Sequence, residues 1–201
     1  MSELVTFVQL GFHHIVDPEA LDHILFLFAL AAIYRGREWR NVLWVVTAFT
    51  VGHSVTLALA VGGAVRFPTP VIEFLIPVTI VVTGLENLLV TRREHASLPR
   101  SYRPAFAAVF GLVHGAGFAN YLRSLFIGPI GVPLLGFNLG IELGQVVVLA
   151  VAAVALGALD QTLGGFRAAR TGWSVHRLRV LAVSIAVVLI ASEMAIARRP
   201  W

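Results

Sequence analysis

Histidine, acidic and amide side chains stand inside stretches of this sequence that are otherwise almost entirely apolar. Asp22 and His23 lie at the start of one apolar run, and His53 and His114 lie within two later runs. At the centre of a membrane-spanning helix an ionisable group costs roughly 2.5–3.5 kcal/mol, so such groups normally face one another or a water-filled cavity. Imidazole and carboxylate both bind divalent transition metals. We therefore expect these residues to meet around a metal ion or along its path.

The chain contains no cysteine, which excludes disulfides and thiolate metal sites. Imidazole and carboxylate ligands favour nickel, cobalt or zinc, whereas copper(I) prefers sulfur. The candidate metal ligands are His14, Asp22, His23, His53, His114 and Glu142. The residues expected to support the site, or to lie along a pathway through it, are Glu86, Asn87, Asn138 and Gln145.

Glu142 and two of the supporting residues show the clearest helical pattern. Asn138, Glu142 and Gln145 are spaced i, i+4 and i+7, which places them within one narrow stripe of an apolar helix. This stripe must face protein or water. It is consistent with a metal pathway, and also with a neutral Glu142 that holds the bundle together by hydrogen bonds.

Each histidine also has a structural interpretation. His53 alone would suit a hydrogen-bonded core histidine, but His114 at similar depth on another helix favours a shared function. Near His114, Gly111 and Gly115 have the spacing that lets two helices approach closely. Because adjacent residues of a helix diverge by about 100°, Asp22 either reaches the edge of the pocket or orients the ring of His23.

Glu86 and Asn87 lie towards the end of the third apolar run, where Glu86 suits either a pathway or a structural acid near the membrane surface. His13 and His14 are expected near the outer surface, where they suit either a point of metal capture or solvent-exposed histidines beside a membrane.

Composition identifies the class of protein. Of the 201 residues, 58% are hydrophobic and 13% are charged, and the mean hydropathy is +0.84, which is typical of an integral membrane protein. We predict an all-α, polytopic fold in one domain, residues 1–201, with a short N-terminal surface helix. The six predicted transmembrane helices are about 18–34, 42–65, 71–90, 105–126, 133–159 and 178–197.

Arginine distribution predicts the orientation. Eleven of the fifteen basic residues, all arginines, follow the first, third and fifth predicted helices, and four lie on the opposite side. The positive-inside rule then places both termini outside a bacterial-type inner membrane. The expected partners are the lipid bilayer and a metal ion, a homo-oligomer is compatible with the sequence, and no nucleic-acid partner is expected.

Six stretches together resemble the hydrogenase/urease accessory (HupE/UreJ) membrane proteins, in the branch with a Phe-Asn-x-Gly-x-Glu-x-Gly-Gln stretch. They are GFHHI from residue 11, DHILFL from 22, TAFTVGHSVTLA from 47, LENL from 85, FGLVHGAGFA from 110 and GFNLGIELGQ from 136.

This resemblance covers about residues 11–150 and implies a secondary nickel or cobalt permease, or another metal-handling protein. The family's functional positions would fall on His14, Asp22, His23, His53, Glu86, His114, Asn138 and Glu142. The nickel-permease branch opens with His-Pro and Gly-x-Asp-His patterns. Here the first is absent, and Ala20 and Leu21 precede Asp22.

Three functions fit these observations. A passive or gradient-driven transporter of a divalent metal needs ligands at several depths and no energy-coupling domain. An intramembrane zinc-like hydrolase would need three histidines and an acid at one depth. A structural accessory protein would use the polar residues for hydrogen bonds alone. We expect the first, and a transport or metal-handling role rather than an enzyme.

Overall fold

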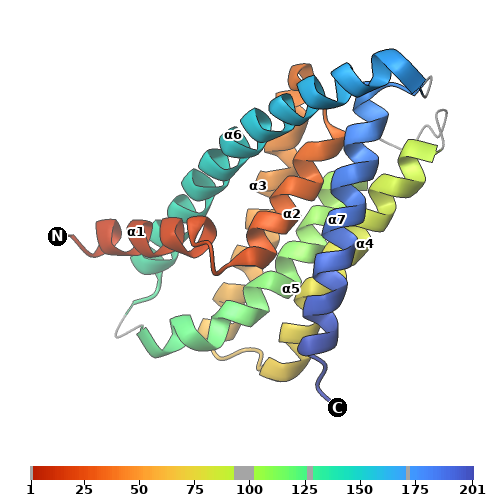
Figure 1. Cartoon of the computed structure of the whole chain (residues 1–201). Coiled ribbons are helices and arrows are strands. Elements are labelled where there is room, and N and C mark those ends of the chain that lie inside the picture. Colours follow the sequence, from red (N-terminus) through yellow and green to blue (C-terminus); the bar gives the residue numbers. More distant parts are fainter. Residues whose placement is uncertain (1, 93–101, 126–128, 171–172) are drawn as a thin grey trace.

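The computed structural model describes residues 2–92, 102–125, 129–170 and 173–201, and these form helices and connecting loops without a β-strand. Consecutive helices from α2 to α7 alternate in direction, while α1 packs against the lower part of α6 (Figure 1). The elements are α1 (Glu3–Val16), α2 (Leu21–Ile33), the short 3-10 helix η1 (Gly36–Glu38), α3 (Trp39–Val61), α4 (Thr69–Arg92), α5 (Tyr102–Leu125), α6 (Gly131–Arg170) and α7 (Val175–Ala197).

The predicted all-α fold is confirmed, and a helix occupies each predicted span. Within the described residues, four helical stretches are long and apolar enough to cross a membrane: Gly36–Val61, Thr69–Thr91, Gly131–Gly164 and Val175–Ala197. α2 is apolar but has 13 residues. α5 carries His114, three glycines and two arginines, which lower its hydropathy. α6 continues eleven residues beyond the predicted end at residue 159, because no proline or helix-ending turn interrupts it before Arg170.

The N-terminal helix is present as predicted, but it packs closely against another helix. A Cβ atom on Gly140 would overlap the carbonyl oxygen of Val8, and one on Gly11 would overlap that of Phe137. Lipid tails are as apolar as the helix side chains, so helices in a membrane associate through close packing, and small residues let their backbones approach. α1 therefore runs along the first half of α6, which brings its last turn, with His14, into the bundle.

α3 and α5 form a second close pair. The missing side chain of Gly52 leaves room for the carbonyl group of Ala108, Gly111 does the same for Phe49, and Gly115 for His53. The predicted close approach at Gly111 and Gly115 is thus confirmed. Because consecutive helices alternate in direction, α3 and α5 run parallel (Figure 1). The contact of Gly115 with the backbone of His53 brings His53 and His114 to similar levels.

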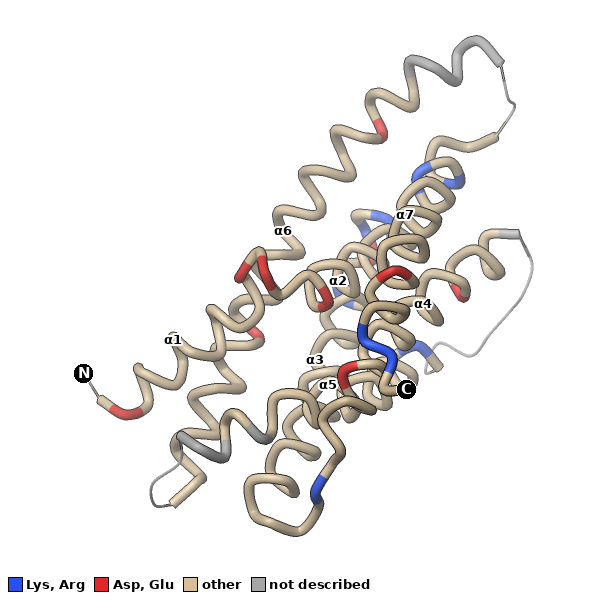
Figure 2. Tube along the Cα trace, turned by 60° about the horizontal axis from the view of Figure 1, so that its bottom comes forward, with Lys and Arg blue, Asp and Glu red and all other residues tan. Residues whose placement is uncertain are grey.

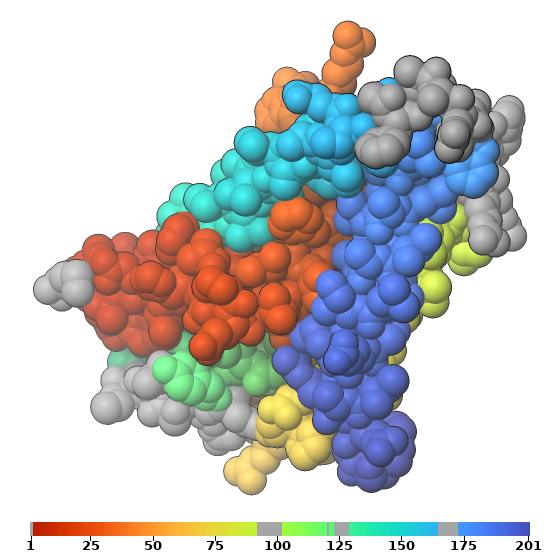
Figure 3. Space-filling model, in the orientation of Figure 1, coloured from red at the N-terminus to blue at the C-terminus, as the bar shows by residue number. Residues whose placement is uncertain are grey.

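α4 and α7 form a third pair, and α2 contacts α4, α6 and α7. α4 packs on α7, where a Cβ on Gly84 would meet the side chain of Val188. In the space-filling view, α1 and α2 fill the angle between α6 and α7 (Figure 3). Charged residues are sparse along the helices and gather mainly near their ends and in the loops (Figure 2), as expected of helices with apolar lipid-facing surfaces.

Candidate functional site

Four histidines from four different helices meet inside the bundle. The ring centroids of His14 on α1 and His23 on α2 are 4.6 Å apart, those of His14 and His53 on α3 are 6.2 Å apart, and those of His23 and His114 on α5 are 5.5 Å apart. His53 is fully buried, His114 is 2% exposed and His23 is 7% exposed. We call these four residues the histidine cluster.

Hydrogen bonds fix the orientation of two of these rings. Nδ1 of His114 lies 2.9 Å from the carbonyl oxygen of Phe110, and Nδ1 of His23 lies 3.0 Å from Oδ1 of Asp22. A carbonyl or carboxylate oxygen can only accept, so each Nδ1 donates and each Nε2 keeps its lone pair. Metal-bound histidines are normally held in this way, with the other ring nitrogen donating to a carbonyl or carboxylate. Asp22 therefore orients His23, one of the two roles expected for it.

The free nitrogens of the cluster are buried without partners. Within the described part of the chain, Nε2 of all four histidines is inaccessible to solvent and accepts or donates no hydrogen bond, and both ring nitrogens of His53 are in this state. Such groups are expensive in an apolar interior. A bound cation would remove this cost by accepting the lone pairs.

The surroundings of the cluster are aromatic. Phe118 lies 4.1 Å from His14 between ring centroids, Phe137 lies 6.2 Å from His53, and Phe49 lies 5.1 Å from His114. Because phenylalanine rings offer no donor atom to a metal ion, the imidazoles are the principal potential ligands at this point. A low dielectric strengthens any electrostatic attraction to an ion there.

The four imidazole rings lie close together, but their nitrogen atoms are not positioned to coordinate one metal ion. Among the described residues, no group of three or more His, Asp or Glu side chains is placed to hold a metal ion as it stands. With metal–nitrogen bonds of about 2.0–2.1 Å, two imidazoles on a tetrahedral ion have centroids roughly 5 Å apart. The observed separations of 4.6, 5.5 and 6.2 Å bracket this value, so modest turns of the rings would be needed to bind.

A cavity of about 350 Å³ leads to the cluster from one end of the bundle. His14, Asp22, His23 and His114 are among its lining residues, and so are Glu73 and Arg198. Arg198, which follows α7, lies 3.5 Å from Oδ2 of Asp22. Glu73 is exposed. The cavity therefore brings together two acids, Asp22 and Glu73, and three of the four imidazoles. Arg198 balances the charge of Asp22, and the remaining carboxylate and the imidazoles suit a hydrated cation.

Glu142 lies in a different place. With Asn138 it lines a groove of about 300 Å³ between α6 and α3, beside Thr50 and Ser54. Oδ1 of Asn138 is buried and has no partner among the described residues. Gln145, 1% exposed, accepts a hydrogen bond of 3.0 Å from Thr50. The predicted stripe thus faces α3: Asn138 and Glu142 lie at the groove and Gln145 bonds to Thr50 beside it, rather than in the cavity beside His23.

Glu86 is held by basic and hydroxyl groups of α5. Nη2 of Arg103 lies 2.7 and 2.8 Å from its two carboxylate oxygens, and Tyr102 donates a further hydrogen bond to it. Asn87, 1% exposed, donates to the carbonyl oxygen of Ala29 at 2.7 Å. Both residues therefore join helices, as in the structural interpretation of Glu86.

Three features of the site were not predicted from the sequence. They are the partners of Glu86, the aromatic rings around the histidine cluster, and the presence of Glu73 and Arg198 in the cavity lining. The sequence does contain one indication of the aromatic rings: Phe49 and Phe110 each precede a histidine by four residues and so share its helix face. The Glu86–Arg103 pair has no such local signal.

Comparison with known proteins identifies the family. A family model described as HupE / UreJ protein matches residues 1–198. No protein of curated function and no solved structure matches the chain significantly. Since the match covers nearly the whole sequence, the chain belongs to the HupE/UreJ family.

Proposed function

We propose that this protein carries a divalent transition metal, nickel or cobalt in the first instance, across a membrane through the histidine cluster. The observation that carries the proposal is the convergence of four imidazoles from four helices, each with a buried and unpartnered Nε2. Membership of the HupE/UreJ family, which is associated with nickel and cobalt handling, supports the choice of metal.

The surroundings of the cluster support a carrier open to one side. On the open side, the cavity lined by Asp22 and Glu73 would attract a cation and pass it to His14 and His23. On the other side, Phe26 stacks on Phe49, with ring centroids 4.9 Å apart. These rings would have to separate before the ion could leave.

Beyond the aromatic rings, Glu86 would act as part of a gate rather than as a free ligand. It lines a small cavity of about 30 Å³ together with Phe26, Phe110 and Arg103. Release of the carboxylate from Arg103 would expose an acid to the departing ion. In alternating access, a fixed site near the midplane opens to one side of the membrane at a time. A histidine cluster with a cavity on one side and stacked aromatic rings on the other is consistent with one such state.

We further propose the arrangement of the chain in the membrane. The single domain would have six spans, with α2 and α5 completing the four long apolar helices, and both termini outside a bacterial-type inner membrane. The arginine excess of the loops after α2, α4 and α6 supports this orientation. The cavity at the C-terminal end of α7 would then open outwards.

Metal titration of the purified protein tests the proposal. Calorimetric titration of nickel or cobalt into detergent-purified protein should give saturable binding near one ion per chain. His53→Ala and His114→Ala should each weaken binding at least tenfold, because each removes a ligand. His13→Ala is the matched control: His13 is exposed and adjacent to His14, and its loss should leave binding unchanged.

Transport requires a second readout. Proteoliposomes containing the wild type should accumulate the metal down its gradient, and His53→Ala should not. Thermal unfolding of each variant without metal separates lost binding from lost folding. Wild-type affinity in folded His53→Ala and His114→Ala would overturn the proposal, and so would binding without uptake in the wild type, which would leave a metal-holding protein.

A further inference from the structure

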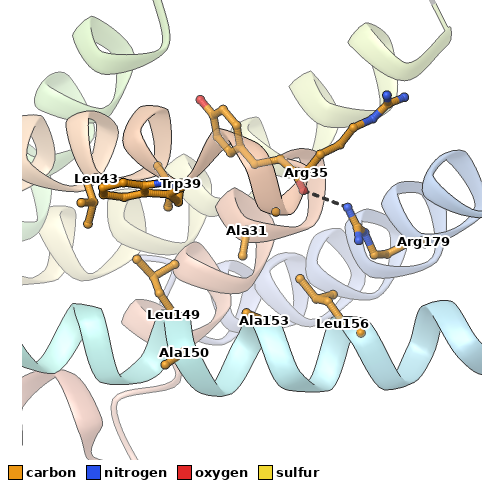
Figure 4. Close-up of a pocket in the computed structure, with 13 residues that line it drawn as sticks. Ala31, Arg35, Trp39, Leu43, Leu149, Ala150, Ala153, Leu156 and Arg179 are labelled. Carbon is orange, nitrogen blue, oxygen red and sulfur yellow. Dashed lines mark hydrogen bonds between the residues drawn. The ribbon is translucent and has the colours of Figure 1, made fainter.

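A second large cavity lies away from the histidine cluster, between α6 and the end of α2. It has a volume of about 440 Å³, within the range of about 300–1,000 Å³ typical of ligand sites. Ala31 lines one wall, and Ala150 and Ala153 line the other (Figure 4). Alanines on facing helices usually permit direct packing, but here an apolar groove separates them.

The two ends of this groove differ. Figure 4 shows Arg35 and Arg179 at one end, with the Arg35 side chain extending outwards from the groove, and Trp39 and Leu43 towards the other end. Trp39 is 56% exposed, and the guanidinium of Arg40 lies 5.4 Å from its ring centroid; exposed tryptophan beside arginine is typical of the membrane–water interface. The groove therefore lies near an interface, with a basic end at Arg35 and Arg179 and an apolar floor.

Arg179 closes the basic end of the groove, and its guanidinium already has hydrogen-bond and ion-pair partners. It donates to the carbonyl oxygens of Ala32 and Tyr34 at 3.2 and 2.9 Å, and its Nη1 lies 2.6 Å from Oδ2 of Asp160. Its charge is balanced by that carboxylate. These bonds hold the end of α2 to α6 and α7. Specific contacts therefore fix the shape of this end of the groove.

Arg35 differs from Arg179 in its exposure and in its partners. It is exposed, and among the residues that the structure describes its guanidinium has no ion-pair partner. Arg37 and Arg40 follow it, against a single acid, Glu38, whose carboxylate accepts the backbone N–H of Arg35 at 2.8 Å. The edge of the groove thus carries an uncompensated positive charge.

We propose that this groove binds an anionic phospholipid, with an acyl chain along Ala31, Ala150 and Ala153 and its phosphate at Arg35. An acyl chain has no polar groups to satisfy, whereas a polypeptide lying on these apolar walls would leave backbone groups unpaired. A zwitterionic lipid would fill the groove but would not neutralise the basic edge. Anionic headgroups gain about 1 kcal/mol per nearby arginine or lysine.

Native mass spectrometry of the full chain tests this inference. The delipidated protein is incubated with phosphatidylglycerol or phosphatidylcholine, and bound lipid is counted. The wild type should retain one phosphatidylglycerol more strongly than phosphatidylcholine. Arg35→Gln should weaken phosphatidylglycerol binding about fivefold and remove the preference. Arg37→Gln, a change of the same kind at an exposed residue outside the lining, should keep it.

A second pair of variants tests the groove itself. Ala153→Phe would fill the space and should abolish retention of either lipid. Val154→Phe changes the neighbouring residue, which is 76% exposed and not part of the lining, and should behave as the wild type.

Equal retention of the two lipids by the wild type would overturn the proposal, as would wild-type binding by Arg35→Gln or by Ala153→Phe. No metal enters these experiments, so their outcome is independent of the proposed transport.

Discussion

The close crossing of α3 and α5 makes a measurable prediction at Gly115. A Cβ atom there would overlap the carbonyl oxygen of His53 and lie 3.0 Å from its carbonyl carbon and its Cα. These are backbone atoms, so no side-chain rotation relieves the contact. Gly115→Ala must therefore push the two helices apart at the level of the histidine cluster.

The magnitude follows from two opposing terms. Alanine is favoured over glycine in a helix by about 1 kcal/mol, while overpacking costs typically about 1–3 kcal/mol and occasionally more. Because the backbone has to move, we expect the upper end of that range and a net loss of about 2 kcal/mol. For a chain of this size, the melting temperature should fall by about 4–8 °C.

Gly157→Ala is the matched control, because a Cβ at Gly157 on α6 would meet nothing within 4 Å. The same substitution should there raise the melting temperature by about 2–4 °C. Thermal unfolding in detergent, without metal, measures both. Gly115→Ala should also weaken metal binding at least tenfold, since a site displaced by more than about 0.5 Å no longer holds its ligands well.

The result that refutes this reasoning is simple. If Gly115→Ala melts at or above the wild-type temperature, α3 and α5 do not pass as closely as described. If it melts lower but binds metal as the wild type does, the crossing stabilises the bundle without positioning the ligands.

Two further predictions concern acids near the site. Asp22→Ala removes the acceptor that orients His23 and should lower metal affinity about 10–100-fold, measured by calorimetry; Asp17→Ala, at an exposed acid of the preceding turn, should not, and equal effects would show a general electrostatic cause. Arg103→Met leaves Glu86 without its cation and should destabilise the protein by about 1–3 kcal/mol. Adding Glu86→Gln should recover part of that loss in a thermal double-mutant cycle, and strictly additive losses would contradict the pair.

The sequence determined the helices and the polar groups within them. Apolar runs of membrane-spanning length specify helices whatever their neighbours are, because the backbone satisfies its own hydrogen bonds within each helix. Four-residue spacing likewise places Phe49 with His53, and Phe110 with His114, on one helix face. These are local properties, and they predicted both the fold class and the residues that now form the histidine cluster.

The tertiary structure alone decided which of these polar groups meet. Glycine contacts set the pairing of α1 with α6 and of α3 with α5, and with it the entry of His14 into the bundle. The same packing turned Glu142 to a groove between α6 and α3 and brought Arg103 to Glu86. A single sequence specifies the face of each helix, but the contacts between faces depend on helix rotation and crossing, which residues far apart in the chain fix together.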